Sequence, residues 1–517
     1  MSAALFFSAP LHGQFYYSDA PRHALNGIFL HDLLVAMPIT HLKQWAIDYY
    51  LQYPALTIMF YPPGLATAEM VGYFLFGESH ATAVAVVCAF DAALIVGAFK
   101  LASRWLPFWQ AWAVGAIVAG LPEVALWARQ PMTDVPAFAF LMWSAVLLLR
   151  YIETKRPLHL YLAAVLFLLG LYTKQSIVFL LPVYLALLWT SEGSAVLRNR
   201  HVWIVSVLFG VLLVPLIVMT VEFGQGNVQS VVSVADSQAS RSSLAAWIYY
   251  SRLLPQQAGW LVLVLAGIAA VGALLVRRWR LPKLAAVLFY GWIVAGYIFF
   301  SAIDLKAQRL DLFILLPFAF FAALGINRML PPRWATAGAI AVALATFGYT
   351  LVYAPVPLVT GYQQAAEWIA KNTPGDSIVA FSGQRDGAFI YDLRLLDRGR
   401  QRRVVRVDKL LLSISIRREL GVVEKESDPA AIAKMFNDYG ISYIVAERDF
   451  FTDLKPMAAF QKVMETPGFV EVARLKVDAT FPHTDKELRI YRNASPLPEE
   501  RKRLKLDMPI IGRDFQE

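Results

Sequence analysis

Ten long apolar segments constrain the fold of this chain more than any other feature of its sequence. A helix needs around 20 apolar residues to cross a hydrocarbon core of about 30 Å, and each segment is near that length. The expected spans lie at roughly 82–100, 110–128, 134–150, 158–173, 175–190, 202–221, 258–276, 284–302, 310–327 and 335–353. Hydrophobic residues make up 58% of the chain, above the share of about half that soluble proteins have. The sequence therefore predicts an α-helical polytopic membrane protein.

The connections between the spans fall into two sets that differ in charge. One set holds thirteen basic residues: Lys100, Arg104, Arg150, Lys155, Arg156, Arg198, Arg200, Arg277, Arg278, Arg280, Lys283, Arg328 and Arg333. The other set holds six: Arg129, Lys174, Arg241, Arg252, Lys306 and Arg309. By the positive-inside rule the first set is cytoplasmic, and the expected location is a bacterial inner (plasma) membrane. The net charge of +9 then reflects topology, so no nucleic-acid partner is expected.

Charge density also divides the chain into domains. Residues 358–517 hold 50 of the 85 charged residues, so a water-soluble, extracytoplasmic domain is expected to begin near Pro357. The predicted parts are an N-terminal extracytoplasmic loop region with interfacial helices (1–80), a bundle of about ten helices (81–356), an α/β domain (357–495) and a charged tail (496–517). The single cysteine, Cys88, excludes a disulfide framework.

The soluble part alternates between helical and extended patterns. Helices are predicted at 362–371 and 429–439, and strands at 377–381, 402–407, 441–446, 469–477 and 487–491. The basic stretch 398–406 is interpreted as a solvated face, which could also meet anionic lipid heads or an acidic glycan.

A polar, acidic stretch precedes the first span: Tyr16-Tyr17-Ser18-Asp19-Ala20-Pro21-Arg22-His23. A carboxylate beside the mouth of a membrane bundle usually serves chemistry or binding, because lipid makes any ion costly. Asp19 is therefore a candidate catalytic base. Asp19 could instead cap the helix that Pro21 opens, and the two roles are compatible.

Four further motifs accompany this loop. They are Tyr61-Pro62-Pro63-Gly64 before an apolar helix that ends at Phe76-Gly77, Arg129-Gln130-Pro131-Met132-Thr133-Asp134, Thr173-Lys174, and Gln308-Arg309 leading into Ile314-Leu315-Leu316-Pro317. With the Asp19 loop, in this order and on one predicted face, they resemble the GT-C membrane glycosyltransferases. The likeness is to the protein O-mannosyltransferase and aminoarabinose transferase superfamily, and it covers most of residues 15–330.

The resemblance implies transfer of a hexosyl or pentosyl group from a polyprenyl-phosphate donor to an acceptor glycan, lipid or protein. Transfer would occur at the extracytoplasmic face of the membrane, with inversion. Asp19 would take the acceptor's proton. Lys174 and Arg309, with Arg129, would bind the donor phosphate, while Asp134 would position the acceptor or hold Arg129 by an ion pair. Tyr17, Arg22, His23 and Tyr61 are the substrate-binding candidates.

The sequence departs from the family in two places. The usual acidic pair in the first loop is reduced to Asp19 followed by Ala20, which puts metal binding there in doubt. A divalent cation stays open as a cofactor, but the spacing of His12, His23, His31 and His41 matches no common ligand pattern. The helix expected before the first loop is also missing, and Met1 to Leu11 is hypothesised to be the tail of a span lost to a late start codon.

Other interpretations are open. Asp134 could cap the span that begins at Val135, and Lys174, Arg309 and Arg129 could be interfacial anchors. A transporter or flippase of a lipid-linked precursor would also place cations at the membrane edge, although no inverted repeat is evident in the sequence. A third hypothesis is a membrane anchor whose soluble domain binds a cell-wall partner.

Overall fold

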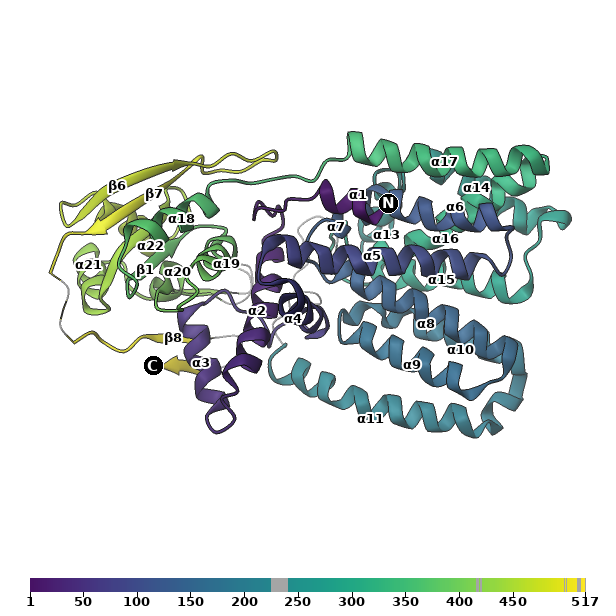
Figure 1. The fold of residues 1–517 in the computed structure, drawn as a ribbon, viewed down its shortest axis with the longest axis horizontal. Coiled ribbons are helices and arrows are strands. Elements are labelled where there is room, and N and C mark those ends of the chain that lie inside the picture. The colour runs from purple at the N-terminus through teal and green to yellow at the C-terminus, as the bar shows by residue number, and fades with distance from the viewer. Residues whose placement is uncertain are drawn as a thin grey trace.

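The computed structural model describes residues 1–224, 240–414, 418, 421–496, 498, 500–508 and 513–516. It shows a helical bundle, a C-terminal α/β domain, and N-terminal helices between the two (Figure 1). The predicted fold class is therefore confirmed. Of the predicted charged tail, residues 497, 499, 509–512 and 517 lie outside the described residues, as do 225–239 of the long connection after the sixth predicted span.

Seven helical segments of the described chain are long and apolar enough to cross a membrane. They are α5 (His80–Ala102), α8 (Asp134–Thr154), η1–α10–η2 (Gln175–Arg198), α11 (Arg200–Glu222), α15 (Lys283–Ser301), η4–α16 (Leu312–Met329) and α17 (Pro332–Tyr353). Two bent pairs raise the number to nine if each is one span. The expected 158–173 span corresponds to the 15-residue helix α9 (Pro157–Leu171), which is apolar but shorter than the seven helices above, so the prediction of about ten spans stays a prediction.

Proline and glycine explain the two bends. Helix α6 (Phe108–Gly120) meets α7 (Pro122–Ala128) at 65°, where Pro122 opens the second helix without a backbone N–H to donate. Helix α13 (Leu244–Ala258) meets α14 (Trp260–Leu275) at 119°, and Gly259 between them has a φ of +78°. Only glycine adopts that backbone conformation at low cost.

The N-terminal region contains short helices, as predicted. They are α1 (Ser2–Phe7), α2 (Ala20–Ala36), α3 (Leu42–Gln52) and α4 (Gly64–Phe76). Helices α2 to α4 lie between the bundle and the C-terminal domain (Figure 1). Helix α4 ends where expected, at Gly77 with a φ of +81°.

The C-terminal domain contains a five-stranded sheet in the order β2-β1-β5-β7-β6. Its strands are β1 (Ile378–Ser382), β2 (Arg403–Arg406), β5 (Ile441–Glu447), β6 (Phe469–Lys476) and β7 (Glu487–Asn493). Strand β1 is parallel to β2 and β5, whereas β7 is antiparallel to β5 and β6. Each predicted strand and helix of this domain is found within two residues of its predicted ends.

The helices of this domain and its smaller strand pairs complete the fold. The helices are α18 (Tyr362–Asn372), α19 (Asp386–Leu396), α20 (Val407–Leu411), α21 (Pro429–Asp438) and α22 (Lys455–Met464). Strands β3 (Leu412–Ile414) and β4 (Val422–Glu424) pair with each other, as do β8 (Lys505–Met508) and β9 (Arg513–Gln516).

Helix α19 docks the domain onto the N-terminal helices through buried polar contacts. Arg394 forms ion pairs with Asp32 of α2 and Glu78, and the hydroxyl of Tyr391 lies 3.3 Å from that of Tyr73 in α4. The interpretation of 398–406 as a solvated face is wrong for most of its arginines. Arg400 pairs with Asp32, Arg406 pairs with Asp386 and Asp408, and Arg402 donates to backbone carbonyls.

Candidate active site

Asp19 occupies the N-cap position of α2, but its side chain does not cap the helix. Pro21 in the first turn favours the helical start, because its fixed φ suits that position. The carboxylate instead faces Arg309, with Oδ2 3.5 Å from a guanidinium nitrogen. The side chain is 21% exposed, so it is open to a substrate.

Asp134 and Lys174 form a tight ion pair at the start of α8. Asp134 is the first residue of α8 and fully buried, while Lys174 lies at the reversal between α9 and η1. The ammonium of Lys174 donates a hydrogen bond to Oδ1 of Asp134. Because a buried carboxylate holds Lys174, the interpretation of this lysine as a freely snorkelling anchor does not account for its position.

Arg309 joins both carboxylates. Its second guanidinium nitrogen is 3.8 Å from Oδ2 of Asp134, so it bridges Asp19 and Asp134. Four residues far apart in the sequence thus form one group of two cations and two carboxylates, the acid–cation cluster: Asp19, Asp134, Lys174 and Arg309. Their formal charges cancel, and Asp19, Lys174 and Arg309 are each partly exposed.

A network of two amides, buried Gln257 and the more exposed Gln308, fixes the segment that carries Arg309. Gln308 donates to Glu123 of α7 at 2.6 Å, and Gln257 donates to the Gln308 carbonyl at 2.7 Å and to Asp311 at 2.6 Å. Glu123 also accepts a hydrogen bond from Trp127 at 2.6 Å. The segment is therefore tied to both bent helix pairs, and the position of Arg309 is determined by the bundle.

Uncharged rings surround the cluster. Tyr17 packs under Arg309 and its backbone N–H donates to Gln130 at 3.0 Å. The ring centres of His23 and Tyr61 are 4.7 Å apart. Burial lowers the pKa of His23 to about 4 and raises the pKa of Tyr61 well above its ordinary value. Both side chains are therefore neutral at pH 7.

Gly64 connects the Tyr61 motif to Lys174. Its backbone N–H donates to the carbonyl of Tyr172 at 2.7 Å. A Cβ at this position would lie 2.3 Å from Oγ1 of Thr173 and 2.7 Å from the Tyr172 carbonyl oxygen. Only glycine allows the two segments to approach this closely.

Two predicted site residues lie elsewhere. Arg22 points to the C-terminal domain and forms an ion pair with Asp386 at 2.6 Å. Arg129 is buried, and its guanidinium donates at 2.9 Å to the carbonyls of Ala125 and Ala354. The ion pair suggested between Arg129 and Asp134 is replaced by those of Lys174 and Arg309. Arg129 therefore holds α7 to the end of α17, and we correct its assignment as a phosphate ligand.

The residues at the cluster do not fit a metal. Both carboxylates are already paired with cations, so a divalent ion would have to displace them. Within the described chain, one group of three candidate ligands comes together: His31, Asp32 and Glu78. Asp32 lies twelve residues beyond the start of α2, about 18 Å along the helix, and is occupied by Arg394.

Sequence reasoning missed several residues that shape the site. Trp127 and Gln130 lie within two residues of Arg129, so the sequence motif around Arg129 could have led to them. Gln257 and Glu123 gave none, because amides and acids at helix ends are common. Arg385 and Asp386 of the C-terminal domain also gave none, although both contact the Asp19 loop.

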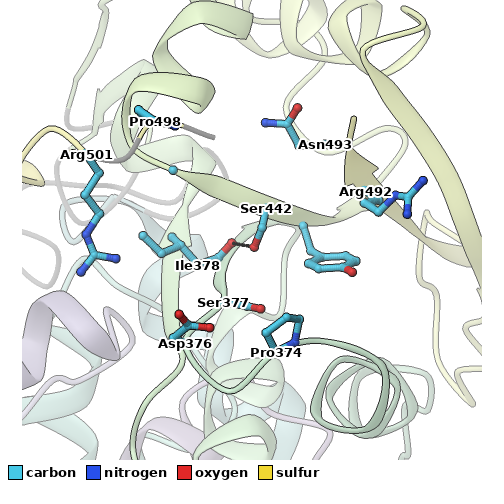
Figure 2. Close-up of a pocket in the computed structure, with 11 residues that line it drawn as sticks. Pro374, Asp376, Ser377, Ile378, Ser442, Arg492, Asn493, Pro498 and Arg501 are labelled. Atoms are coloured by element: carbon cyan, nitrogen blue, oxygen red, sulfur yellow. Dashed lines mark hydrogen bonds between the residues drawn. The ribbon is translucent and has the colours of Figure 1, made fainter. Parts of the chain in front are cut away.

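A cavity of about 500 Å³ in the C-terminal domain is separate from this site (Figure 2). Ser377, Ile378, Gly440 and Ser442 line it at the amino ends of β1 and β5, with Arg492 and Arg501 at its rim. The residues that contact the Asp19 loop follow the carboxyl end of β1. The cavity therefore lies at the opposite edge of the sheet.

Comparisons with known proteins agree with this architecture. Residues 61–219 match the family model of dolichyl-phosphate-mannose-protein mannosyltransferase, a range that contains Tyr61, Asp134 and Lys174. No curated protein matches the chain in sequence.

Solved structures share the fold at low identity. A crystal structure of ArnT from Cupriavidus metallidurans bound to undecaprenyl phosphate has 14% identity and a TM-score of 0.66, covering 96% of this chain and 97% of ArnT. The Archaeoglobus fulgidus oligosaccharyltransferase has 11% identity and a TM-score of 0.52, over 77% of this chain and 63% of that one. The arabinofuranosyltransferase AftD from Mycobacteria has 15% identity and a TM-score of 0.50, over 83% and 35%.

The comparisons do not identify the sugar or the acceptor. The shared fold agrees with the membrane bundle and C-terminal α/β domain described above, and the partial family match falls on the part of the chain that carries Asp134 and Lys174. The chain therefore has the fold that these GT-C glycosyltransferase structures share, and its residues 61–219 match the dolichyl-phosphate-mannose-protein mannosyltransferase family model.

Proposed function

We propose that the chain transfers a sugar from a polyprenyl-phosphate donor to an acceptor hydroxyl or amine at the extracytoplasmic face of a bacterial inner membrane, with inversion. The observation that carries this proposal is the convergence of Asp19, Asp134, Lys174 and Arg309 at the end of the bundle that faces the C-terminal domain. An ArnT crystal structure with undecaprenyl phosphate shares the fold, which supports a lipid phosphate as the donor.

In this reaction one bond forms and one breaks. The acceptor's oxygen or nitrogen attacks the anomeric carbon, and the bond from that carbon to the phosphate oxygen breaks. Asp19 takes the acceptor's proton. The lipid phosphate leaves with one more negative charge than it had in the donor.

The charge of the site stays balanced throughout. As Asp19 gains a proton it loses its negative charge, and Arg309 loses an anionic partner 3.5 Å away. The departing phosphate gains a negative charge at the same time. Arg309 can therefore move its interaction from Asp19 to the phosphate, with its planar fork suited to phosphate oxygens. The interaction is strongest where water is excluded.

Asp134 keeps Lys174 charged and in place. A buried lysine without a carboxylate partner would favour its neutral form, which binds phosphate poorly. Because Asp134 is fully buried, whereas the side chain of Lys174 is 14% exposed, the lysine is the member of the pair that can meet the donor. The rings of Tyr17 and Tyr61, beside Arg309 and Asp19, would contact the sugar or acceptor.

The test is transfer of radiolabelled sugar from a polyprenyl-phosphate donor by the purified full-length protein. Asp19→Asn should abolish turnover and retain donor binding, since the side chain keeps its size and loses its basicity. A fully active Asp19→Asn protein would show that another group is the base. Movement of the lipid across vesicle membranes without sugar transfer by either protein would instead support the transporter hypothesis.

A further inference from the structure

We propose that Arg385 and Asp386 of the C-terminal domain are positioning residues that hold the Asp19 loop, Tyr16–Arg22, in its working geometry. The inference rests on the proposed function, because it assigns these residues a role in placing the base. Two contacts bracket Asp19, one at each end of the loop.

The first contact is at the start of the loop. Arg385 donates a hydrogen bond to the carbonyl oxygen of Tyr16 at 2.6 Å. Its guanidinium carbon also lies 5.0 Å from the ring centre of Phe481, and that ring packs edge-on against Tyr16 at 5.1 Å. One arginine therefore holds the Tyr16 backbone and, through Phe481, its ring.

The second contact is at the end of the loop. Arg22 forms an ion pair with Asp386 at 2.6 Å, and their side chains are 18% and 5% exposed. The other oxygen of Asp386 is 2.8 Å from Arg406, which in turn pairs with Asp408. Asp386 is thus fixed from within its own domain, so it can act as a rigid anchor.

The backbone there is also close-packed. A Cβ at Gly387 would lie 2.9 Å from Cγ of Arg22 and 3.5 Å from Cγ of Pro21. Helix α19 therefore presses directly on the first turn of α2, where Asp19 is the N-cap residue. A shift of this contact would move the carboxylate relative to Arg309.

The fold explains why these residues are available. Strand β1 lies between its parallel partners β2 and β5, so its carboxyl end is a topological switch point of the sheet. The crevice at such a point is where open α/β sheets usually bind ligands. Here Arg385, Asp386 and Gly387, which follow β1, contact the Asp19 loop of the same chain. Helix α19 lies next to α2 (Figure 1).

Placement of a base demands high precision. A displacement of about 1 Å in a reacting group can cost about a hundredfold in rate, with little change in substrate affinity. Loss of either anchor should therefore lower kcat and leave KM for the lipid donor nearly unchanged. A role in donor binding would raise KM instead.

The experiment compares two arginines of the same docked region in the full-length protein. Arg385→Gln removes the part-buried contact to Tyr16, and the matched control Arg394→Gln removes a more deeply buried contact to Asp32, far along α2. We expect Arg385→Gln to lower kcat at least about tenfold, while Arg394→Gln stays within about twofold of wild type at 20 °C. Equal losses of kcat in both variants would overturn the proposal.

Asp386 supplies the second pair of variants. Asp386→Asn should lower kcat, and Asp386→Glu should restore part of it by keeping the charge toward Arg22. If Asp386→Glu is no more active than Asp386→Asn, while both fold, the ion pair does not position the loop.

Hydrogen–deuterium exchange gives a readout that does not depend on activity. Peptides that cover residues 16–22 should exchange faster in Arg385→Gln and Asp386→Asn than in wild type or Arg394→Gln. Unchanged exchange there would overturn the inference even if the variants lose turnover. Faster exchange in a protein whose wild type transfers no sugar would instead show that the anchor exists and that the proposed function is wrong.

Discussion

The guanidinium carbon of Arg309 lies 4.4 Å from the centre of the Tyr17 ring. The same guanidinium carbon lies 5.7 Å from the centre of the Trp127 ring. The guanidinium nitrogens of Arg309 form ion pairs with Asp19 and Asp134. The cation is thus held by ring faces as well as by carboxylates. Tyr17 precedes the first span and Arg309 lies before the last two, so this contact joins distant parts of the chain at the site.

Arg309→Lys should weaken the site although the charge is kept. A lysine ammonium has no planar fork, so it cannot stack on Tyr17 and bridge two carboxylates at once. We expect kcat/KM for the lipid donor to fall roughly tenfold to a hundredfold, about 1.4 to 2.8 kcal/mol of transition-state stabilisation. The exposed Arg252 supplies the control, since Arg252→Lys should stay at wild-type activity. An Arg309→Lys protein within twofold of wild type would contradict the assignment.

Asp134→Asn should make the thermal stability of the protein depend more strongly on bound lipid phosphate than it does in wild type. Removing one partner of a buried ion pair leaves an uncompensated charge, at a cost of about 3 to 5 kcal/mol. A bound phosphate would supply the missing anion to Lys174 and Arg309. Thermal unfolding in detergent should therefore show a larger rise in Tm on adding polyprenyl phosphate for the variant than for wild type. Equal rises would mean that these cations do not meet the phosphate.

Gly64→Ala should disturb the Lys174 reversal. The added methyl group would overlap Thr173 and the Tyr172 carbonyl, and overpacking of this kind costs about 1 to 3 kcal/mol. We expect a lower Tm and reduced transfer, measured on the same preparation. Gly348 in α17 is the matched control, because a Cβ there meets no atom within 4 Å and alanine favours a helix. If both alanine variants behave alike, the close approach at Gly64 is not important.

The spans could be predicted from sequence because hydropathy is a local property. Most apolar runs had the length that a hydrocarbon core requires, and seven helices lie near those limits, although α9 is shorter and two expected spans are bent. The 119° break at Gly259 was not predicted, since a single glycine does not define an angle. The charge pattern of the connections likewise indicated that Asp19, Asp134, Lys174 and Arg309 share one end of the bundle.

Pairing within the site could not be read from the sequence. Arg129 and Arg309 are both arginines at the end of an apolar segment, yet one is bonded to backbone carbonyls and the other to Asp19 and Asp134. The difference depends on the bend between α6 and α7, which brings Arg129 to the end of α17. Arg406 shows the same limit. Its ion-pair partner Asp386 follows β1, and only the order of strands in the sheet brings that residue beside β2 and Arg406.

Glu447 should make the stability of the C-terminal domain fall as pH rises. It is fully buried at the end of β5, accepts hydrogen bonds from Tyr362 and from the Gln384 backbone N–H, and lies near Asp485, His483 and Arg385. Burial raises its pKa from 4.5 to about 7. The folded domain therefore binds the proton more tightly than the unfolded chain does. Its unfolding free energy should decrease between pH 4.5 and 7, by on the order of 3 kcal/mol, and level off above pH 7.

Glu447→Gln tests this directly, because an amide copies the protonated acid: its carbonyl oxygen can accept from the Gln384 N–H and its NH2 can donate to the Tyr362 hydroxyl oxygen. We expect the variant to lose the pH slope and to exceed wild-type Tm at pH 8, measured by thermal unfolding of the full chain. His483 cannot imitate the effect, since burial lowers its pKa and makes stability rise with pH. Asp485 can, because burial raises its pKa as well, so Asp485→Asn is the discriminating variant. A slope that survives Glu447→Gln and vanishes in Asp485→Asn would assign the proton to Asp485.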